Sequence, residues 1–398
     1  IARLSDLNSA VTKSRQKGFE QPNSEPVLTE HGFRPIGDLK VGDKVYSKDG
    51  KLTNVIGVYP QGVKDVYEIE FLDKRKVRCG INHLWEVRER KTLKVRSLKQ
   101  MLERGITYKA IATLTSGEKK EYKGYRYGVE EIEPIVFPEN TVPIPAYALG
   151  ALLGDGSFTK SQCRLTSADQ EVFDLVLEDL GKDYHTGKRD QAENHYRATI
   201  IYEKRFDSLD SKYVNARYGV NPLLRELKEL GLTGTNCYNK FIPEVYLKSS
   251  VENRVAFLQG LMDTDGFVSE KGYDINFTTT FERLQADVVE LCRSLGVPAH
   301  SCEFPPAKET DHRFWRVRIG NKISLFRLTR KKNRQRLDRE RRTKNSIINV
   351  VKLGVEESTC IEVDHPSHTY ITKDYVLTHN TLKLMSKLMR KLWFVRQS

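Results

Sequence analysis

Near its C-terminal end the chain reads Cys360-Ile-Glu-Val-Asp-His-Pro-Ser-His368-Thr-Tyr-Ile-Thr372, and a little further on Asp374-Tyr-Val-Leu-Thr-His379-Asn380-Thr381. An asparagine side chain can cyclise onto its own main chain when a neighbouring histidine polarises the following peptide bond. A hydroxyl residue directly after it can carry an acyl group as an ester. His379, Asn380 and Thr381 stand in that order, so the segment predicts a chain that can cut its own backbone.

A second informative segment, Val27-Leu-Thr-Glu-His-Gly-Phe-Arg-Pro-Ile-Gly-Asp-Leu-Lys-Val-Gly-Asp-Lys-Val-Tyr46, opens a region of short alternating runs with a turn at Gly42-Asp43. Runs rich in β-branched and aromatic residues, bounded by turn residues, are typical of β-strands. Such runs lie at 44–47, 52–59, 65–71 and 76–79, and they return at 347–353. We therefore expect an all-β region at both ends of the chain, with a helix-compatible piece at 97–104.

These segments, some 300 residues apart, resemble the opening and closing strands of an intein, the protein-splicing element. The resemblance implies an all-β, horseshoe-like HINT splicing domain built from both ends of the chain. It also implies that Asn380 is the last residue of the excised element, and that the flanking residues are exteins, the host-protein segments that splicing joins.

Two apolar runs echo each other in the middle of the chain, Tyr147-Ala-Leu-Gly-Ala-Leu-Leu-Gly-Asp155-Gly and Ala256-Phe-Leu-Gln-Gly-Leu-Met-Asp-Thr-Asp265-Gly. Each is a helix-compatible run that ends in an acid and a glycine, and the two acids lie 110 residues apart. The segments that follow, 169–181 and 284–296, echo each other as well. This internal repeat predicts a duplicated α/β unit.

The paired runs resemble the LAGLIDADG motif of homing endonucleases, over residues 137–338. The resemblance implies that two helices pack through small residues and bring Asp155 and Asp265 together. Two such carboxylates can share Mg²⁺, which activates water for phosphodiester hydrolysis. Lys240 falls where family members carry a lysine that supports hydrolysis electrostatically, and Lys322 is the candidate from the second half. We expect Asp263 to cap main-chain groups and not to bind metal.

Composition agrees with a nucleic-acid partner. The length of 398 residues predicts more than one domain. The chain has 66 Lys or Arg and 53 Asp or Glu residues, and the resulting net charge of +13 favours double-stranded DNA as a partner. The basic run 327–342 is a candidate for contacts with phosphates. The six cysteines form no Cys-x-x-Cys pair, so we expect buried, reduced thiols and no zinc site. No apolar run approaches the roughly 20 residues that span a bilayer, so we expect a cytoplasmic protein, of a bacterium or a phage-infected cell, without a membrane partner.

The resemblances predict an all-β HINT domain interrupted by an α/β (α+β), pseudo-symmetric, two-repeat LAGLIDADG endonuclease, in a monomer. The expected parts are an N-extein remnant at 1–20, the first part of the splicing domain with a candidate DNA-recognition insertion at 21–136, the endonuclease at 137–338, the second part of the splicing domain at 339–380, and a C-extein remnant at 381–398.

The usual first nucleophile of an intein is missing. Most inteins begin with Cys or Ser, whereas counting back from the first strands puts the start near Glu20, within about two residues. Trp85, two positions after His83, combines with Cys360 and Thr381 into a set that resembles the class 3 inteins. In that class the internal cysteine attacks the upstream junction directly.

The class 3 resemblance implies a role for each residue of the splicing centre. His83 activates the upstream scissile amide, and Cys360 as a thiolate forms a thioester-linked branch, with Trp85 packed around that thiol. Thr381 accepts the acyl group as an ester. Asn380 cyclises with help from His379 and His368. A spontaneous oxygen-to-nitrogen shift then leaves a peptide bond.

One residue departs from the family pattern. The threonine usually found three positions before the histidine is Gly80 here, so the oxyanion support of that hydroxyl must come from elsewhere, such as backbone N–H groups. With Cys360 as first nucleophile, we expect replacement of Glu20 or Pro22 by Ala to change splicing little.

The flanks and two alternatives remain open. Removing the element joins Ser14-Arg-Gln-Lys-Gly18 and a short remainder to Thr381 and an amphipathic stretch, which resembles the phosphate-binding loop of a phage large terminase ATPase. One alternative is a DNA endonuclease whose splicing domain is inactive and serves as a DNA-binding platform. The other is a class 1 intein whose first nucleophile has been removed.

Overall fold

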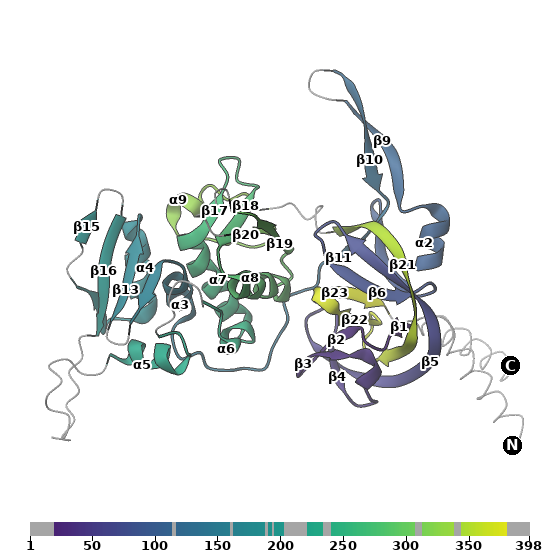
Figure 1. Cartoon of the computed structure of the whole chain (residues 1–398), viewed down its shortest axis with the longest axis horizontal. Helices are drawn as coiled ribbons and strands as arrows, with labels where there is room; N and C mark the ends of the chain where they lie inside the picture. Colours follow the sequence, from purple (N-terminus) through teal and green to yellow (C-terminus); the bar gives the residue numbers. More distant parts are fainter. Residues whose placement is uncertain are drawn as a thin grey trace, which may run out of the picture. The chain divides into compact units, whose positions relative to one another are not determined.

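The computed structural model describes residues 20–113, 117–159, 162–187, 190–192, 195–202, 221–233, 240–306, 313–337 and 344–379. It divides into two compact units: unit 1 comprises the chain up to Ile135 and from Glu340 onward, and unit 2 comprises Val136–Arg339. Unit 1 is built mainly of strands, whereas unit 2 combines helices and sheets (Figure 1). None of the helices among the described residues is long and apolar enough to cross a membrane.

Unit 1 contains a sheet of 12 strands among the described residues, in the order β1-β21-β11-β7-β23-β22-β2-β4-β5-β6, with β3 on β2 and β8 on β7. β21 also pairs with β5, which joins two distant members of this order. The strands are β1 (Gln21–Pro22), β2 (Pro26–Thr29), β3 (Gly32–Pro35), β4 (Lys44–Tyr46), β5 (Leu52–Phe71), β6 (Lys76–Gly80), β7 (Leu84–Glu89), β8 (Thr92–Ser97), β11 (Tyr127–Glu130), β21 (Lys344–Val363), β22 (Thr369–Thr372) and β23 (Val376–His379), with 3-10 turns η1 (Ile36–Asp38) and η4 (Lys373–Tyr375).

The predicted strands of unit 1 form, but two of them are joined. The expected strands at 52–59 and 65–71 are parts of the single 20-residue strand β5, which runs alongside the equally long β21. Pro60 and Gly62 favour a break, but the pairing of β5 with β21 shifts register there and continues past them. Such bulges absorb an extra residue without ending a ladder.

A helix and a projecting hairpin follow β8. The predicted helix forms as α2 (Leu98–Arg104), and Ser97 caps it through a reciprocal capping box with Gln100. β9 (Thr107–Thr113) and β10 (Lys119–Tyr125) then pair only with each other and extend away from the sheet of unit 1 (Figure 1). The hairpin exposes aromatic and aliphatic side chains beside several lysines, including Tyr108, Ile111 and Tyr122.

Unit 2 consists of two halves with the same strand order. The first half has α3 (Ala146–Asp155), β12 (Gly156–Phe158), β13 (Cys163–Ser167), α4 (Gln170–Leu180), β14 (Tyr184–Thr186), β15 (Asp190–Ala192), β16 (His195–Tyr202) and α5 (Pro222–Glu229). The second has α6 (Glu244–Leu247), α7 (Val251–Asp265), β17 (Gly266–Val268), β18 (Ile275–Thr279), α8 (Glu282–Ser294), β19 (Ala299–Phe304), β20 (Phe314–Ile319) and α9 (Thr329–Lys332). The sheets run β12-β13-β16-β14 and β17-β18-β20-β19, as a duplication requires.

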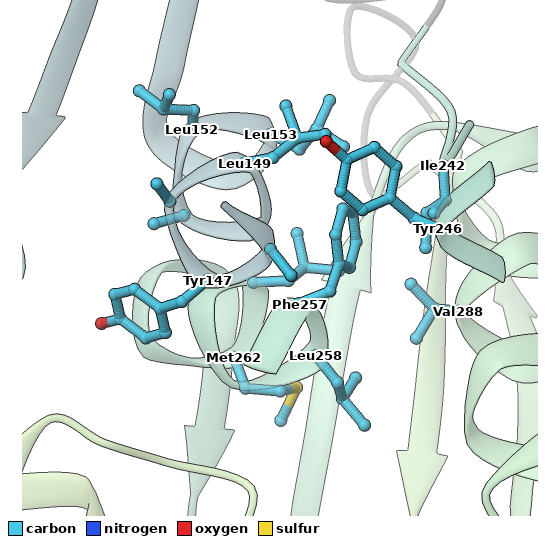
Figure 2. Close-up of a cluster of buried hydrophobic side chains, with 14 of the residues drawn as sticks. Tyr147, Leu149, Leu152, Leu153, Ile242, Tyr246, Phe257, Leu258, Met262 and Val288 are labelled. Carbon is cyan, nitrogen blue, oxygen red and sulfur yellow. The ribbon is translucent and has the colours of Figure 1, made fainter. Parts of the chain in front are cut away.

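Helices α3 and α7 cross at the centre of unit 2, packed as the sequence predicts through small residues. A Cβ added to Gly150 would lie 2.1 Å from the carbonyl oxygen of Phe257, and one added to Gly260 would lie 2.1 Å from that of Tyr147. Only glycine permits this approach of one helix backbone to the other. Around the crossing, apolar side chains of α3, α6, α7 and α8 form one buried core (Figure 2).

Candidate active sites

Histidines from separate segments meet at one end of β7 in unit 1. His83 lies in the turn before β7, where its main-chain N–H donates to the carbonyl of Gly80 at 3.1 Å. Its Nε2 lies 2.5 Å from Oγ1 of Thr378 on β23. β23 pairs with β7 at His379 opposite Leu84, so His379 is held beside the strand that follows His83.

His379 is held as a neutral imidazole. Its ring lies 6.4 Å, centroid to centroid, from that of His368. Burial, together with the neighbouring His368 and His83, lowers the pKa of His379 to about 4. Because its ordinary value is near 6.5, His379 is uncharged at pH 7 and can exchange a proton with a neighbouring amide.

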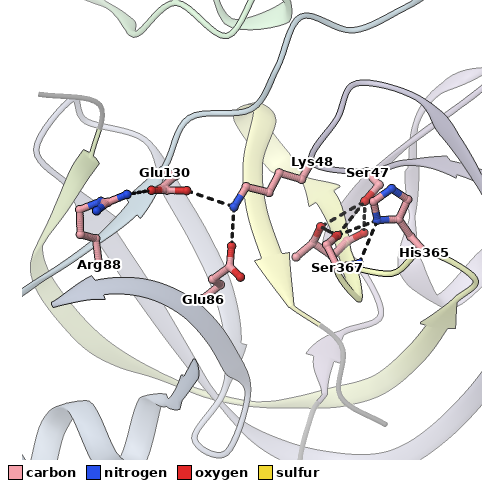
Figure 3. Close-up of polar contacts among 8 residues, drawn as sticks. Ser47, Lys48, Glu86, Arg88, Glu130, His365 and Ser367 are labelled. Carbon is pink, nitrogen blue, oxygen red and sulfur yellow. Dashed lines mark hydrogen bonds and ion pairs between the residues drawn. The ribbon is translucent and has the colours of Figure 1, made fainter. Parts of the chain in front are cut away.

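A polar network holds the loop that carries His368, whose φ is +52°. Ser47 Oγ donates to the carbonyl of Thr369 at 2.7 Å, and Thr369 Oγ1 lies 2.6 Å from Ser367 Oγ. His365 Nδ1 lies 2.7 Å from the same Ser367 hydroxyl (Figure 3). These contacts on both sides of His368 fix a backbone conformation that non-glycine residues rarely adopt.

A second network fixes β7, the strand that follows His83. Lys48 donates to Glu86 on β7 at 2.6 Å and to Glu130 on β11 at 3.0 Å, and Arg88 pairs with Glu130 (Figure 3). The shared cation joins two neighbouring strands to the β4–β5 turn, so the base of the histidine cluster is rigidly supported.

Cys360 lies on β21, with 8% of its surface exposed. Burial, together with the carboxylates of Glu20 and Glu362, raises the pKa of its thiol to about 12. A thiol in this environment stays protonated at neutral pH, and the attack of Cys360 as a thiolate stays a prediction. A nucleophilic Cys360 needs a group that accepts its proton.

Trp85 is fully buried behind His83, with ring centroids 5.4 Å apart in an edge-to-face arrangement. Its indole N–H lies beside the thiol of Cys79, and among the described residues no acceptor is in hydrogen-bonding geometry with it. The contact between Trp85 and Cys360 that the resemblance implies stays a prediction.

Asn380 and Thr381 lie outside the described residues, as do both flanking segments with the resemblance to a terminase loop. The last described residue of this region is His379, buried at the end of β23.

In unit 2 the two motif acids stand at the C-terminal ends of the crossed helices. Asp155 is the last residue of α3 and Asp265 the last of α7. A Cβ added to Gly154 would lie 3.2 Å from Oδ2 of Asp265, so the helix ends are in close contact. Burial and then the charge of Asp265 raise the pKa of Asp155 to about 7, and burial raises the pKa of Asp265.

One lysine binds each helix end, the half-buried Lys240 at α3 and the buried Lys331 at α7. Lys240 Nζ donates to the carbonyls of Leu153, Gly154 and Gly156 at 2.6, 2.8 and 3.3 Å. Lys331 Nζ donates to the equivalent carbonyls of α7 at its C-terminal end, namely those of Asp263, Thr264 and Gly266, at 2.7, 3.2 and 2.7 Å, and also to that of Met262.

The partner of Lys240 is therefore Lys331, and not Lys322 as expected. Both lysines lower the pKa of Asp155 and Asp265 through their charge, and burial lowers the pKa of Lys331 to about 8. The spacing of the repeat does not reveal Lys331, because the two lysines lie 91 residues apart whereas the carbonyls that they contact lie 110 residues apart. Lys331 also stands inside the basic run 327–342, where a buried lysine is not expected.

Several side chains of the basic run 327–342 make contacts within unit 2. Arg330 makes two hydrogen bonds to the carboxylate of Asp169, at 2.7 and 2.6 Å, and Arg327 stacks over the ring of Tyr147. Asp263 accepts the main-chain N–H groups of Arg327 and Leu328, each at 3.0 Å, as the expected capping group does. In this segment Arg334 and Arg336 are exposed.

The carboxylates of Asp155 and Asp265 suit a hard cation such as Mg²⁺ that also binds phosphate oxygens of a substrate. Among the described residues, no group of three or more His, Cys, Asp or Glu is arranged to hold a metal ion by itself. Mg²⁺ is bound in nucleases by one or two carboxylates, the remaining positions being taken by water and phosphate oxygens. Two adjacent carboxylates, with Asp155 half-buried and Asp265 exposed, fit that requirement.

Comparison with known proteins matches part of the chain to homing endonucleases. Residues 241–325 match the family model of the homing endonuclease. The chain is 26% identical over 379 residues to the replicative DNA helicase DnaB of Mycobacterium intracellulare, covering 89% of this chain and 57% of that protein. It is 27% identical over 161 residues to the homothallic switching endonuclease of Saccharomyces cerevisiae, covering 39% of this chain and 27% of that protein.

The chain spans less than two thirds of the length of either relative. Among similar solved structures is a variant of the gp41-1 intein, 19% identical, covering 30% of this chain and 94% of that one with a TM-score of 0.20. The resemblance to homing endonucleases predicted from the sequence is confirmed, and inteins are among the similar structures, as predicted.

Proposed function

We propose that this chain is an intein that excises itself and joins its flanking segments, and that unit 2 is a DNA endonuclease. The observation that supports splicing best is the meeting of His83, Thr378, His379 and His368, contributed by both sequence segments of unit 1. For DNA cleavage the corresponding observation is the pair of motif acids with one lysine at each helix end.

Splicing would begin with Cys360. Its sulfur attacks the carbonyl carbon of the upstream junction, the carbon–nitrogen bond breaks, and a thioester branch forms. His83 activates that junction. The hydroxyl of Thr381 then attacks the thioester and frees the thiol, which leaves the acyl group as an ester on Thr381.

Release of the element would follow at Asn380. Its side-chain nitrogen attacks its own carbonyl carbon, so a succinimide forms and the amine of Thr381 is released. Neutral His379, with His368 beside it, exchanges the protons of this step. The ester then rearranges to the peptide bond that joins the flanking segments.

DNA cleavage would use Asp155 and Asp265 as ligands of Mg²⁺, which supplies charge neutralisation and an activated water in phosphodiester hydrolysis. The chain's own contribution is to hold both carboxylates at the crossing of α3 and α7, partly desolvated. Lys240 and Lys331 fix the helix ends, and their charges lower the pKa of both carboxylates against the opposite effect of burial.

The partner would be a long double-stranded DNA site. The net charge of +13 favours the phosphate backbone. The β9–β10 hairpin presents Lys109, Lys120 and Lys123 beside exposed Tyr108 and Tyr122, which suits contact with a duplex by a two-stranded ribbon. It lies within the region expected to hold a DNA-recognition insertion.

The host protein would be a nucleic-acid ATPase. The similarity to a DnaB helicase favours a helicase extein, whereas the segments before and after the element resemble a phage terminase loop. We expect a monomer that acts in the cytoplasm of a bacterial or phage-infected cell.

The test is a pair of reciprocal variants. Asp155→Asn should abolish magnesium-dependent cleavage of target DNA, because it removes one ligand charge, and should leave splicing unchanged. Asn380→Ala should prevent C-terminal release and let the branched or N-cleaved form accumulate, because only asparagine closes the succinimide, and should leave DNA cleavage unchanged. Agarose gels measure cleavage and mass spectrometry measures the protein products. The exposed Asp274→Asn is the matched control for Asp155.

The outcomes separate the alternatives. A chain that cleaves DNA but never yields an excised product would be an endonuclease on an inactive HINT platform. Splicing that survives in Cys360→Ala would rule out the class 3 mechanism. Loss of both activities in Asp155→Asn, with the fold intact by circular dichroism, would refute the independence of the two units.

A further inference from the structure

Glu20 lies where β1 meets the strand that carries Cys360. β1 pairs with β21 so that Gln21 is opposite Thr359. One step further along this antiparallel register, Glu20 stands opposite Cys360. On the other side, the carbonyl of Glu20 accepts the N–H of Gly80 at 2.9 Å.

The side chain of Glu20 occupies the space beside Gly80, where inteins usually carry a threonine side chain. A Cβ added to Gly80 would lie 2.2 Å from Oε1 of Glu20, so any side chain there would displace the carboxyl. Glu20 is only 3% exposed, and its Oε2 has no hydrogen-bond partner among the described residues. A buried carboxylate oxygen left open is costly and needs a functional explanation.

That carboxyl faces the buried thiols. The charge of Glu20 raises the pKa of both Cys360 and Cys79, as a carboxyl at this position of the register would do. Glu362 also faces Cys360, but its Oε2 already accepts the hydroxyl of Tyr59 at 2.9 Å. The other titratable groups facing these thiols are Tyr370 on β22, which donates to Gln21, and Glu25, which is paired with Arg78.

We propose that the Glu20 carboxyl accepts the proton of Cys360 in the first step of splicing, and that the upstream junction is the peptide bond between Phe19 and Glu20. The proposal rests on the proposed splicing function and adds to it the group that makes a buried, protonated thiol reactive.

The proton balance is closed. As the Cys360 sulfur bonds to the carbonyl carbon of Phe19, the thiol proton passes to a Glu20 oxygen. When the carbon–nitrogen bond breaks, that proton passes to the leaving nitrogen of Glu20, and the carboxylate is restored. No free thiolate forms beside the carboxylate, which would oppose it.

The buried Glu20 thus changes one expectation drawn from the sequence. Replacing Pro22 with Ala should still have little effect, whereas replacing Glu20 should slow the first step. Its carboxyl stands at Gly80, in the place of the hydroxyl that inteins usually carry three residues before the histidine.

The test compares pH profiles of branch formation in the full chain. In the parent the rate should change little between pH 7 and 9, because Glu20 accepts the proton. In Glu20→Gln it should fall roughly 100-fold at pH 7, a typical loss for a general base, and then rise about tenfold per pH unit with the thiolate fraction of a thiol whose pKa is about 12. Glu20→Asp should recover part of the rate, and the control Glu362→Gln should match the parent.

A second pair of variants checks the spatial argument. Gly80→Ala should slow branch formation in the parent, because its Cβ displaces the carboxyl, but not in Glu20→Gln. Equal rates and parallel pH profiles for the parent and Glu20→Gln, or an equal cost of Gly80→Ala in both, would overturn the inference. Splicing in Cys360→Ala would instead overturn the underlying mechanism. Mass spectrometry of the excised product checks the junction. The product should begin at Glu20, and a product that begins at another residue would refute the proposed junction.

Discussion

At the residue scale, unit 1 tunes its two key groups in opposite ways. Burial lowers the pKa of His379 to about 4 and raises that of Cys360 to about 12. Desolvation disfavours the charged form in both cases, so both groups are neutral at pH 7. A neutral imidazole is ready for proton exchange, whereas a neutral thiol needs a base. His379 can therefore exchange protons as it stands, whereas Cys360 requires a group that accepts its proton.

The low pKa of His379 predicts how stability depends on pH. Between pH 6.5 and about 4 the unfolded chain binds a proton at this residue that the folded chain does not, so stability falls as pH falls through this window. Relative to His379→Gln, which lacks this titration, the parent should lose up to about 3 kcal/mol of unfolding free energy between pH 7 and pH 4. Urea titrations followed by tryptophan fluorescence measure the free energy of unfolding at each pH. A difference between the two proteins that is constant with pH would contradict the burial of a neutral His379.

The positions of residues were predictable where motif spacing sets them. The pattern around Asp155, Asp265 and His379 brings those residues to helix ends and to a buried strand, as expected. Glu20 and Lys331 were not identified, because their roles depend on which main-chain groups they meet after folding. A lysine in a basic run and a glutamate near a chain junction carry no local signal of burial.

At the scale of elements, the crossing of α3 and α7 sets the distance between the motif acids. Gly150 and Gly260 allow backbone-to-backbone contact at the crossing. Because Asp155 and Asp265 end these helices, a change in helix separation moves both carboxylates. The geometry of the acids therefore depends on residues that never touch DNA.

Gly260→Ala tests this dependence. Alanine favours an isolated helix, but here its Cβ would meet the carbonyl oxygen of Tyr147 at 2.1 Å, and a backbone atom cannot move aside cheaply. We expect a loss of roughly 1–3 kcal/mol in the hydrogen-exchange protection of α3 and α7, with a large drop in DNA cleavage and unchanged splicing. Glu252→Ala, an exposed position on the same helix, is the control. Protection equal in the two variants would show that the crossing tolerates a side chain.

The sequence predicted most elements but not the lengths of all strands. Alternation and turn residues located β4, β6 and the ends of β5. Pro60 and Gly62 suggested a boundary, whereas long-range pairing with β21 keeps the ladder intact through register shifts. Local patterns report turn preference, but only the partner strand decides whether pairing continues.

At the scale of the whole molecule, unit 1 is formed by two segments of chain on either side of unit 2. Each unit has its own buried core. Because each candidate site is built on its own core, we expect splicing and DNA cleavage to be separable by single substitutions.

The most direct measurement places reporter domains before residue 1 and after residue 398 and follows the products by gel and intact mass. The parent should yield joined reporters and a free excised element. Cys360→Ala should form neither branch nor joined reporters, whereas Cys79→Ala, which removes another buried thiol near Trp85 and Glu20, should still form the branch. Joined reporters from Cys360→Ala, or a parent chain that stays intact, would contradict self-excision through Cys360.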